Sequence, residues 1–236
     1  MEKMKTVIIA VVATVVVAGI AFYLIGLRKT SPTPPPVQDT QAQDEEQVAA
    51  PLPVPELTKT FAEPGAGYTM GYPEEWTYET KDETFQTVVF SGAPGTEAYR
   101  ATVNIQNVMN KENGGEFVTA QELMDDLKAQ FTSSEDGVII DEGPLAYSTA
   151  AGETLQGVQV AAEYKLQGET YQQWQIVVPH ADGKHFCAIA YTAPAGLFRA
   201  YQPTAQALIE SWSMVEGTEE TPEATAEDTP EEEETR

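Results

Sequence analysis

Apolar and polar residues alternate most regularly between residues 156 and 194, in three runs rich in β-branched and aromatic side chains. Short turns with glycine separate the runs, Gln167-Gly168 after the first and Asp182-Gly183 after the second. Runs of this kind, joined by short glycine turns, are typical of adjacent antiparallel strands. The pattern therefore predicts a three-stranded antiparallel meander around which the rest of the domain is built.

The second hairpin of this meander has an expected register. A symmetric loop centred on Asp182-Gly183 places three pairs of largely apolar residues on one face, as a buried face requires. The expected pairs are Val178 with Cys187, Ile176 with Ile189, and Trp174 with Tyr191.

Two loops are compatible with the first hairpin. A two-residue loop sets Val160 opposite Gln175, which mixes apolar and polar side chains on one face. A three-residue loop that ends at Gly168 avoids this mixture, so we expect a type I turn followed by a glycine bulge. The pairs are then Val160 with Trp174 and Lys165 with Glu169.

Alternating segments also precede the meander. Residues 84–91 and 99–108 alternate well, and we expect them to pair as strands across the loop at 92–97. The segment 67–76 is typical of a strand that leads into a proline turn, and 137–141 predicts a short strand.

Two segments have helical patterns. Thr119 followed by Glu122 has the spacing of a capping box, which predicts a helix over residues 118–131. A second helical segment spans 195–212, with Pro203 either in its first turn or at a kink. The apolar stripe of the first helix consists of Leu123, Leu127 and Phe131.

Strands outnumber helices in these predictions, and the helical segments interrupt the strands rather than alternate with them. This order predicts an α+β domain over residues 58–216, a mostly antiparallel twisted β-sheet packed with helices.

A different pattern occupies the start of the chain. The run from Thr6 to Gly26 holds 21 uncharged residues, with two basic residues close to each end. At about 1.5 Å per residue, such a helix can cross a hydrocarbon core of about 30 Å. We expect an uncleaved transmembrane signal anchor, with residues 1–5 as a cytoplasmic tail and the domain outside the cytoplasm, in the cell membrane. The alternative is a cleaved signal peptide.

The segments on either side of the domain have no helical or strand pattern. Residues 27–57 are rich in proline, which fixes φ and removes hydrogen-bond donors, so we expect an extended stalk. Residues 217–236 are acidic and contain no large hydrophobic residue, which predicts a disordered tail.

Composition excludes one class of partner. The chain has 37 acidic and 13 basic residues, a net charge of −24. A chain this acidic repels a phosphate backbone, and no basic stripe is visible, so we expect no nucleic-acid binding.

The single cysteine allows no disulfide within the chain. Cys187 lies mid-strand on the expected core face, where we expect it to be a small buried hydrophobic residue rather than a reactive thiol.

The two histidines are the main candidates for chemistry. His180 and His185 flank the Asp182-Gly183 loop, and the symmetric register puts them directly opposite each other, with Cβ atoms about 4.5–5.5 Å apart. Two imidazoles at this distance suit Zn²⁺ or Cu²⁺, with Asp182 as an oxygen ligand. The competing interpretation is a polar hairpin tip with two exposed rings.

Other chemistry has less support. Acidic pairs lack the spacing of a calcium loop, so only weak binding of cations such as Ca²⁺ or Mn²⁺ is expected from them. No nucleophile-elbow, phosphate-loop or dinucleotide motif occurs. We therefore expect a protein that is not an enzyme and has no cofactor.

Four early aromatic residues belong either to the core or to a binding groove: Tyr68, Tyr72, Trp76 and Tyr78.

Four short motifs are spread over the predicted domain: Tyr72-Pro73 followed by Trp76, Val103-Asn104-Ile105, Tyr191-Thr192-Ala193-Pro194 and Ser211-Trp212. Together they resemble the PsbP-type domain, a superfamily named for an extrinsic subunit of photosystem II. The resemblance spans about residues 61–215. It implies an α/β/α sandwich with an antiparallel sheet, and a non-enzymatic binding or assembly role outside the cytoplasm. The acidic domain and the anchor differ from the photosynthetic members, so no photosystem-docking residue is carried over.

The sequence thus predicts a membrane-anchored, extracytoplasmic binding or assembly module with an unidentified protein partner. The alternative is a divalent-metal-binding module that uses His180 and His185. A hydrolase centred on these histidines is the third and least favoured interpretation.

Overall fold

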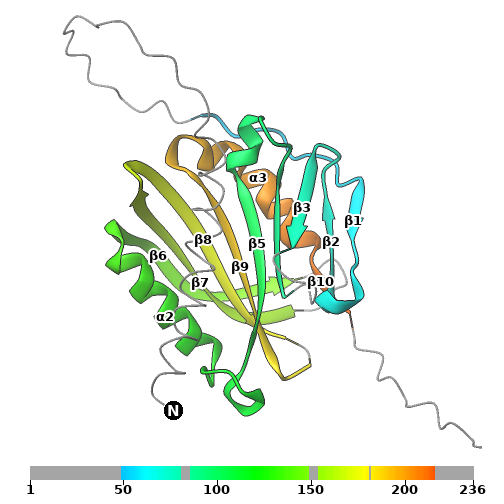
Figure 1. Cartoon of the computed structure of the whole chain (residues 1–236), viewed down its shortest axis with the longest axis vertical. Helices are drawn as coiled ribbons and strands as arrows, with labels where there is room; N and C mark the ends of the chain where they lie inside the picture. The colour runs from blue at the N-terminus through cyan, green and yellow to red at the C-terminus, as the bar shows by residue number, and fades with distance from the viewer. Residues whose placement is uncertain (1–48, 81–85, 149–153, 181, 216–236) are drawn as a thin grey trace, which may run out of the picture.

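The computed structural model describes residues 49–80, 86–148, 154–180 and 182–215 (Figure 1). Its largest element is a seven-stranded sheet in the order β3-β4-β5-β9-β8-β7-β6, in which all neighbouring strands are antiparallel. The strands are β3 (Trp76–Thr80), β4 (Thr87–Gly92), β5 (Thr102–Met109), β6 (Glu135–Ser148), β7 (Thr154–Leu166), β8 (Glu169–Pro179) and β9 (His185–Pro194).

A smaller three-stranded sheet has the order β1-β2-β10. Two α-helices and three short 3₁₀ helices complete the described part of the chain. These elements are β1 (Lys59–Phe61), β2 (Tyr68–Tyr72), β10 (Ser213–Met214), α2 (Ala120–Ser133), α3 (Ala195–Ser211), η1 (Pro64–Ala66), η2 (Glu97–Arg100) and η3 (Lys111–Asn113).

The large sheet is covered on both faces. Alternate residues of β8 and β9 belong to two separate buried clusters, as the period of two in a strand requires. Ile176 and Ile189 pack with Leu208 of α3 and with the small sheet, whereas Val177 packs with Leu127 of α2. The α+β architecture predicted from the sequence is therefore confirmed, with one α-helix on each face of the sheet (Figure 1).

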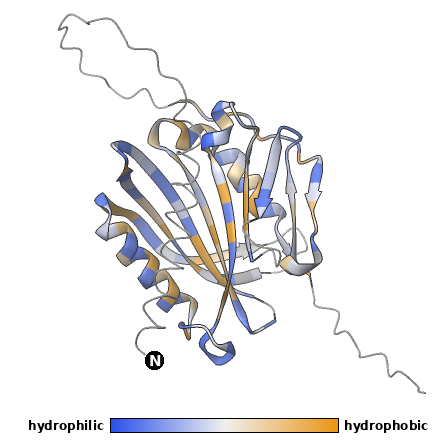
Figure 2. Ribbon diagram, viewed as in Figure 1, coloured by the Kyte–Doolittle hydropathy of each residue, from blue (hydrophilic) through white to orange (hydrophobic). Residues whose placement is uncertain are grey.

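The distribution of hydrophobic residues follows these layers. The ribbon of α2 alternates between hydrophobic and hydrophilic residues, and hydrophobic residues concentrate in the central strands of the large sheet (Figure 2). Leu123, Leu127 and Phe131, the stripe predicted from the sequence, are all buried on the inner side of α2. Core packing explains this stripe.

The register of the second hairpin was predicted correctly. Between β8 and β9, the three expected pairs are all present, and their side chains lie in or against the core on the α3 side. The pairs are Val178 with Cys187, Ile176 with Ile189, and Trp174 with Tyr191.

The register of the first hairpin was predicted wrongly. Val160 lies opposite Gln175, and Leu166 lies opposite Glu169, so the loop has two residues, Gln167 and Gly168. Both loop residues have positive φ angles, 54° and 83°, as a type I′ turn requires. The rejected alternative is therefore the observed one.

Buried glutamines explain the error. Gln173 and Gln175 lie on the α2 side of the sheet and are almost completely buried. The hydroxyl of Tyr164 donates to Gln173 Oε1 at 3.1 Å, and Gln173 Nε2 donates to Gln175 Oε1 at 2.9 Å. Gln175 Nε2 in turn donates to the carbonyl oxygen of Ile189 at 3.1 Å. Because these amides are hydrogen-bonded, their burial carries a small cost, and a mixed face is stable.

The capping box at α2 is present with a small shift. Thr119 Oγ1 accepts a hydrogen bond from the Glu122 N–H at 3.1 Å, as predicted. The Glu122 carboxylate accepts from the N–H of Val118 at 2.8 Å, one residue before the usual partner. Thr119 is the N-cap, and the helix occupies Ala120–Ser133, two residues later than the predicted range.

Two other predicted elements differ in extent. The short strand predicted at 137–141 is part of β6, which has 14 residues and pairs with β7 through two register irregularities. Pro144 lies within β6, which is tolerated because β6 is an edge strand. Pro203 lies inside α3, well beyond the first turn.

The predicted tail 1–5, membrane span 6–26 and acidic tail 217–236 lie outside the described residues, as does most of the stalk. Among the residues that are described, no helix is long and apolar enough to cross a membrane. The last stalk residues run beside α3. Ala49 N–H donates to the carbonyl of Gly196 at 3.1 Å, and Leu52 N–H donates to that of Ala200 at 3.0 Å.

The type I′ turn generates a prediction about stability. Asparagine tolerates positive φ better than glutamine does, and Asn-Gly is the preferred sequence for this turn. We expect Gln167→Asn to stabilise the protein by roughly 0.5 kcal/mol, and the β-branched Gln167→Val to destabilise it by roughly 1 kcal/mol. Urea unfolding of the full chain in detergent, followed by tryptophan fluorescence, measures both changes. Equal midpoints for the two variants would contradict the turn assignment.

Candidate functional site

The two histidines lie opposite each other at the end of the β8–β9 hairpin. His180 directly follows β8, and His185 is the first residue of β9. The N–H of His180 donates to the carbonyl oxygen of His185 at 2.9 Å, which is the pairing expected for a symmetric loop. Their ring centroids are 6.2 Å apart, and the ring planes are nearly perpendicular.

Asp182 connects the two rings. Its Oδ2 lies 2.7 Å from His185 Nδ1, and its Oδ1 lies 3.2 Å from His180 Nδ1. Oδ1 also accepts hydrogen bonds from the backbone N–H groups of Lys184 at 2.7 Å and His185 at 3.1 Å. The Asp182 carboxylate therefore holds the loop closed and orients the His185 ring, whereas His180 Nδ1 accepts a hydrogen bond from the Asp182 backbone N–H at 3.2 Å.

These contacts change the acidity of Asp182. Partial burial raises the pKa of its carboxyl, but the hydrogen bonds from Lys184 and His185 and the nearby His180 lower it more, to a pKa of about 2. The carboxylate is therefore charged over the whole physiological range.

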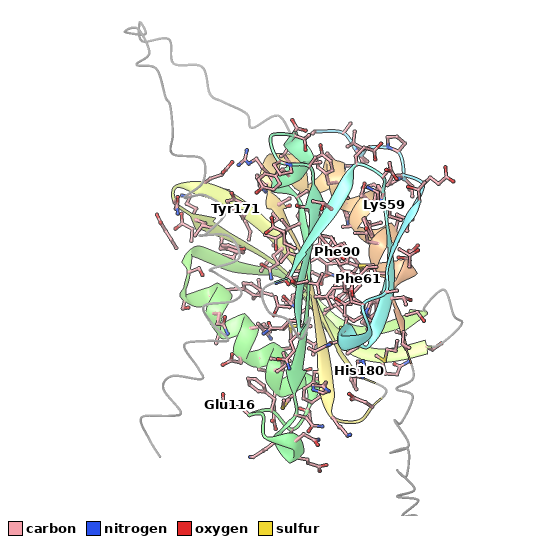
Figure 3. All side chains as sticks on the ribbon, turned by 45° about the vertical axis from the view of Figure 1, so that its right-hand side comes forward. Lys59, Phe61, Phe90, Glu116, Tyr171 and His180 are labelled. Atoms are coloured by element: carbon pink, nitrogen blue, oxygen red, sulfur yellow. The ribbon has the colours of Figure 1, made fainter. Side chains whose placement is uncertain are left out.

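The rings are not a solvent-exposed tip, contrary to one interpretation of the sequence. The His180 side chain is only 8% exposed and that of His185 is 26% exposed. His180 packs beside the turn between η1 and β2 (Figure 3). Gly67 in this turn has φ of +71°, and a Cβ there would lie 3.4 Å from His180 Nε2. A Cβ at this distance would make an ordinary van der Waals contact, so the positive φ, and not the ring, favours glycine at this position.

The predicted metal ligands do not form a complete site by themselves. Across the described ranges, no three or more His, Cys, Asp and Glu side chains are arranged to hold a metal ion. Asp182 hydrogen-bonds to the Nδ1 atoms of both rings, so it is positioned as a partner of the histidines. The metal site formed by His180, His185 and Asp182 stays a prediction.

Cys187 has the environment predicted for it. The thiol is completely buried next to Val178, and this burial raises its pKa far above the usual range. A thiol in these surroundings belongs to the core and is not activated as a nucleophile.

The four early aromatic residues belong to the core and not to a groove. Tyr68, Tyr72 and Trp76 are buried, and Tyr78 packs against the same cluster. Phe61 lies at the centre of this group, with its ring centroid 5.0 Å from that of Tyr78 (Figure 3). Their size and position are explained by packing between the two sheets.

Sequence reasoning missed two features of the surface. Met109 at the end of β5 lies opposite His185 and is 44% exposed. Val138 and Ile140 on the edge strand β6 are also exposed, at 51% and 57%. The position of Met109 opposite His185 depends on the order of strands in the sheet. Hairpin patterns do not give this order, because β5 and β9 are far apart in the sequence.

The Asp182 contacts generate a prediction about pH. The folded-state pKa of the Asp182 carboxyl, about 2, lies below its ordinary value of 3.8, so the carboxylate stabilises the fold above about pH 4, and this contribution is lost as the pH falls towards 2. Since the side chain is about one-third exposed, solvent screens the effect, and we expect Asp182→Asn to cost about 1 kcal/mol at pH 7. Urea unfolding of the full chain at several pH values measures this difference.

Asp126→Asn is the matched control, because Asp126 is an exposed acid that accepts a hydrogen bond from Gln130 on the same helix. The difference between wild type and Asp182→Asn is expected to shrink below about pH 3. A difference independent of pH, or one of equal size for Asp126→Asn, would contradict the role assigned to Asp182.

Comparison with known proteins finds similar chains among solved structures. No protein-family model matches the chain. No curated protein matches it either. Among solved structures, a protein of Bacteroides thetaiotaomicron has a TM-score of 0.44 at 16% identity, over 68% of this chain and 50% of that one. The chain thus spans half the length of that protein.

Two other similar structures have names. Cyanobacterial PsbP from Synechocystis sp. PCC 6803 has a TM-score of 0.45 at 10% identity, over 66% of this chain and 92% of that one. LpqN, described as involved in cell envelope biogenesis of Mycobacterium tuberculosis, has a TM-score of 0.45 at 10% identity, over 63% and 83%. PsbP is the family that the sequence motifs resemble.

Proposed function

We propose that this chain is a membrane-anchored, non-enzymatic module that binds a protein partner outside the cytoplasm. The uncharged run at 6–26, with basic residues on both sides, supports the anchor. The proline-rich segment that follows supports a stalk, which separates the domain from the bilayer.

The proposed partner binds at the exposed surface of β6. β6 is the last strand of the large sheet, so among the described residues its outer edge faces no other strand. Val138 and Ile140 are both more than half exposed on this strand. Exposed β-branched residues on a sheet edge are unusual without a partner, because such edges promote association.

The charge around these two residues indicates the chemistry of the partner. Four carboxylates lie on β6, and among the described residues two lysines pair with them: Lys128 with Glu142, and Lys165 with Asp136 at 2.5 Å. The remaining acids of β6 are Glu135 and Asp141. We infer that the occupant is an extended segment that alternates apolar and basic side chains.

A hydrolase is less well supported by the same coordinates. Both imidazoles hydrogen-bond to Asp182, and within the described residues no hydroxyl or thiol group hydrogen-bonds to either ring. A nucleophile activated by histidine requires such a contact. The binding role needs no group of this kind.

The first test concerns orientation. We expect protease added to intact cells that express the full chain to digest the domain without permeabilisation. A C-terminal epitope tag reports the cleavage on a blot. A domain protected until the cells are lysed would overturn the extracytoplasmic placement.

The second test concerns the β6 surface. We expect a fluorescent ten-residue peptide of alternating valine and lysine to bind the full chain in non-ionic detergent, and a valine–glutamate peptide to bind far more weakly. Replacing both Val138 and Ile140 by serine removes apolar contact area and should weaken binding by roughly 10-fold or more. Fluorescence anisotropy gives the dissociation constants.

Val118→Ser is the matched control, because Val118 is also exposed, at 54%, but lies outside β6. It should bind the lysine peptide as the wild type does. Equal binding of both peptides, or an unchanged affinity in the double serine variant, would show that β6 is not the docking surface.

A further inference from the structure

The face of the large sheet that carries α3 is only partly covered. α3 packs on β9, β8, β5 and β2, whereas α2 packs on β6 and β7 from the opposite face. In Figure 1, the halves of β6 and β7 beside α2 lie away from α3. Within the described part of the chain, the α3 side of these two half-strands is therefore open.

A row of three residues crosses this open face from strand to strand. Asp141 of β6 lies opposite Ala161 of β7, which lies opposite Trp174 of β8. Residues directly opposite each other in an antiparallel sheet point to the same face. Neighbouring strands are about 4.8 Å apart, so β6 and β8 are separated by roughly 10 Å, with the shortest side chain of the row between them.

The side chains in this row are accessible. Asp141 is exposed, and Ala161 and Trp174 are both partly exposed. Trp174 packs against the core on the α3 side with part of its surface. The rest of the indole provides an apolar surface next to the space above Ala161.

Hydrogen bonds hold the polar side chains that surround the row. The indole Nε1–H of Trp174 donates to Gln159 Oε1 at 3.0 Å. Gln172 Nε2 donates to Glu163 Oε2 at 2.9 Å. Among the described residues, Gln159 Nε2 and Gln172 Oε1 have no protein partner, so one oriented donor group and one oriented acceptor are left for a ligand.

The glutamines on the other face of the same strands do not have this property. Gln173 and Gln175 are almost completely buried, and their amides bond to each other and to neighbouring groups. Burial explains those two residues, but it does not explain Gln159 and Gln172, which are partly exposed.

This combination of groups matches the chemistry of a sugar. A pyranose ring has apolar C–H groups on its faces and hydroxyl groups at its edge, which suit an aromatic ring and planar amides or carboxylates. The carboxylates of Asp141 and Glu163 accept hydrogen bonds from hydroxyl groups but repel an anionic ligand. The ligand is therefore uncharged.

We propose that this face, here called the β6–β8 face, binds a neutral oligosaccharide. The proposal goes beyond the binding of a peptide at the edge of β6, because it uses neither Val138 nor Ile140. The β6–β8 face consists of Asp141, Gln159, Ala161, Glu163, Gln172 and Trp174.

Tryptophan fluorescence of the full chain in a polyoxyethylene detergent tests the proposal, with cellohexaose as the probe. Trp76 and Trp212 are only 5% and 0% exposed, so a change on binding reports on Trp174. We expect a saturable change with a dissociation constant below about 1 mM. No saturable change, together with no heat of binding in calorimetry, would overturn the proposal.

A charged oligosaccharide of the same length tests the electrostatic part. Hexagalacturonate carries a carboxylate on each ring, and repulsion from Asp141 and Glu163 should weaken its binding about 10-fold or more relative to cellohexaose. Equal affinity for the two oligosaccharides would contradict the assigned role of the carboxylates.

Ala161→Phe is the most specific variant, because it fills the space between β6 and β8 without removing a hydrogen bond. An aromatic residue is compatible with a strand, so the fold is retained. We expect cellohexaose binding to be lost in this variant. Gln159→Ala and Gln172→Ala should each weaken binding roughly 5-fold or more, since each removes hydrogen-bonding groups.

Gln121→Ala is the matched control, because Gln121 is an exposed glutamine on α2, which covers the opposite face, and it donates to Asp125 at 2.9 Å. It should bind cellohexaose as the wild type does. Circular dichroism establishes that each variant is folded. Unchanged affinity in folded Ala161→Phe, or an equal loss in Gln121→Ala, would show that the β6–β8 face is not the binding surface.

Discussion

The antiparallel pairing of β8 with β9 is the interaction on which the rest of the structure depends. It sets which residues face α3 and which face α2, because one step in register would exchange the two faces. The same pairing brings His180 opposite His185 at one end. The core and the candidate site are thus consequences of one ladder of backbone hydrogen bonds.

The extent to which the fold is predictable from sequence varies with the chemistry of each strand. The β8–β9 register was predictable because largely apolar residues on both strands have to share one face. The β7–β8 register was not, because Gln173 and Gln175 are buried in a hydrogen-bonded network whose partner Tyr164 lies on the other strand. A rule that keeps amides out of a core fails when the amides satisfy each other.

The candidate site was predictable only within its own hairpin. The distance between the histidines followed from local register, but their contacts with Asp182 depend on side-chain orientation, and the place of Met109 opposite His185 depends on β5 lying beside β9. Pairing between strands some 80 residues apart leaves no local pattern in the sequence. Contacts of this type are determined by the packing of the whole domain.

The path of residues 49–52 has a consequence for the proposed attachment to a membrane. Residues Ala49 and Leu52 hydrogen-bond to the first turns of α3, which begins where β9 ends. β9 has ten residues, so its two ends are about 33 Å apart. A tether at the N-terminus therefore joins one pole of the domain, while the histidine hairpin occupies the other. With the proposed membrane anchor, this arrangement would present the hairpin to the surrounding medium and not to the lipid headgroups.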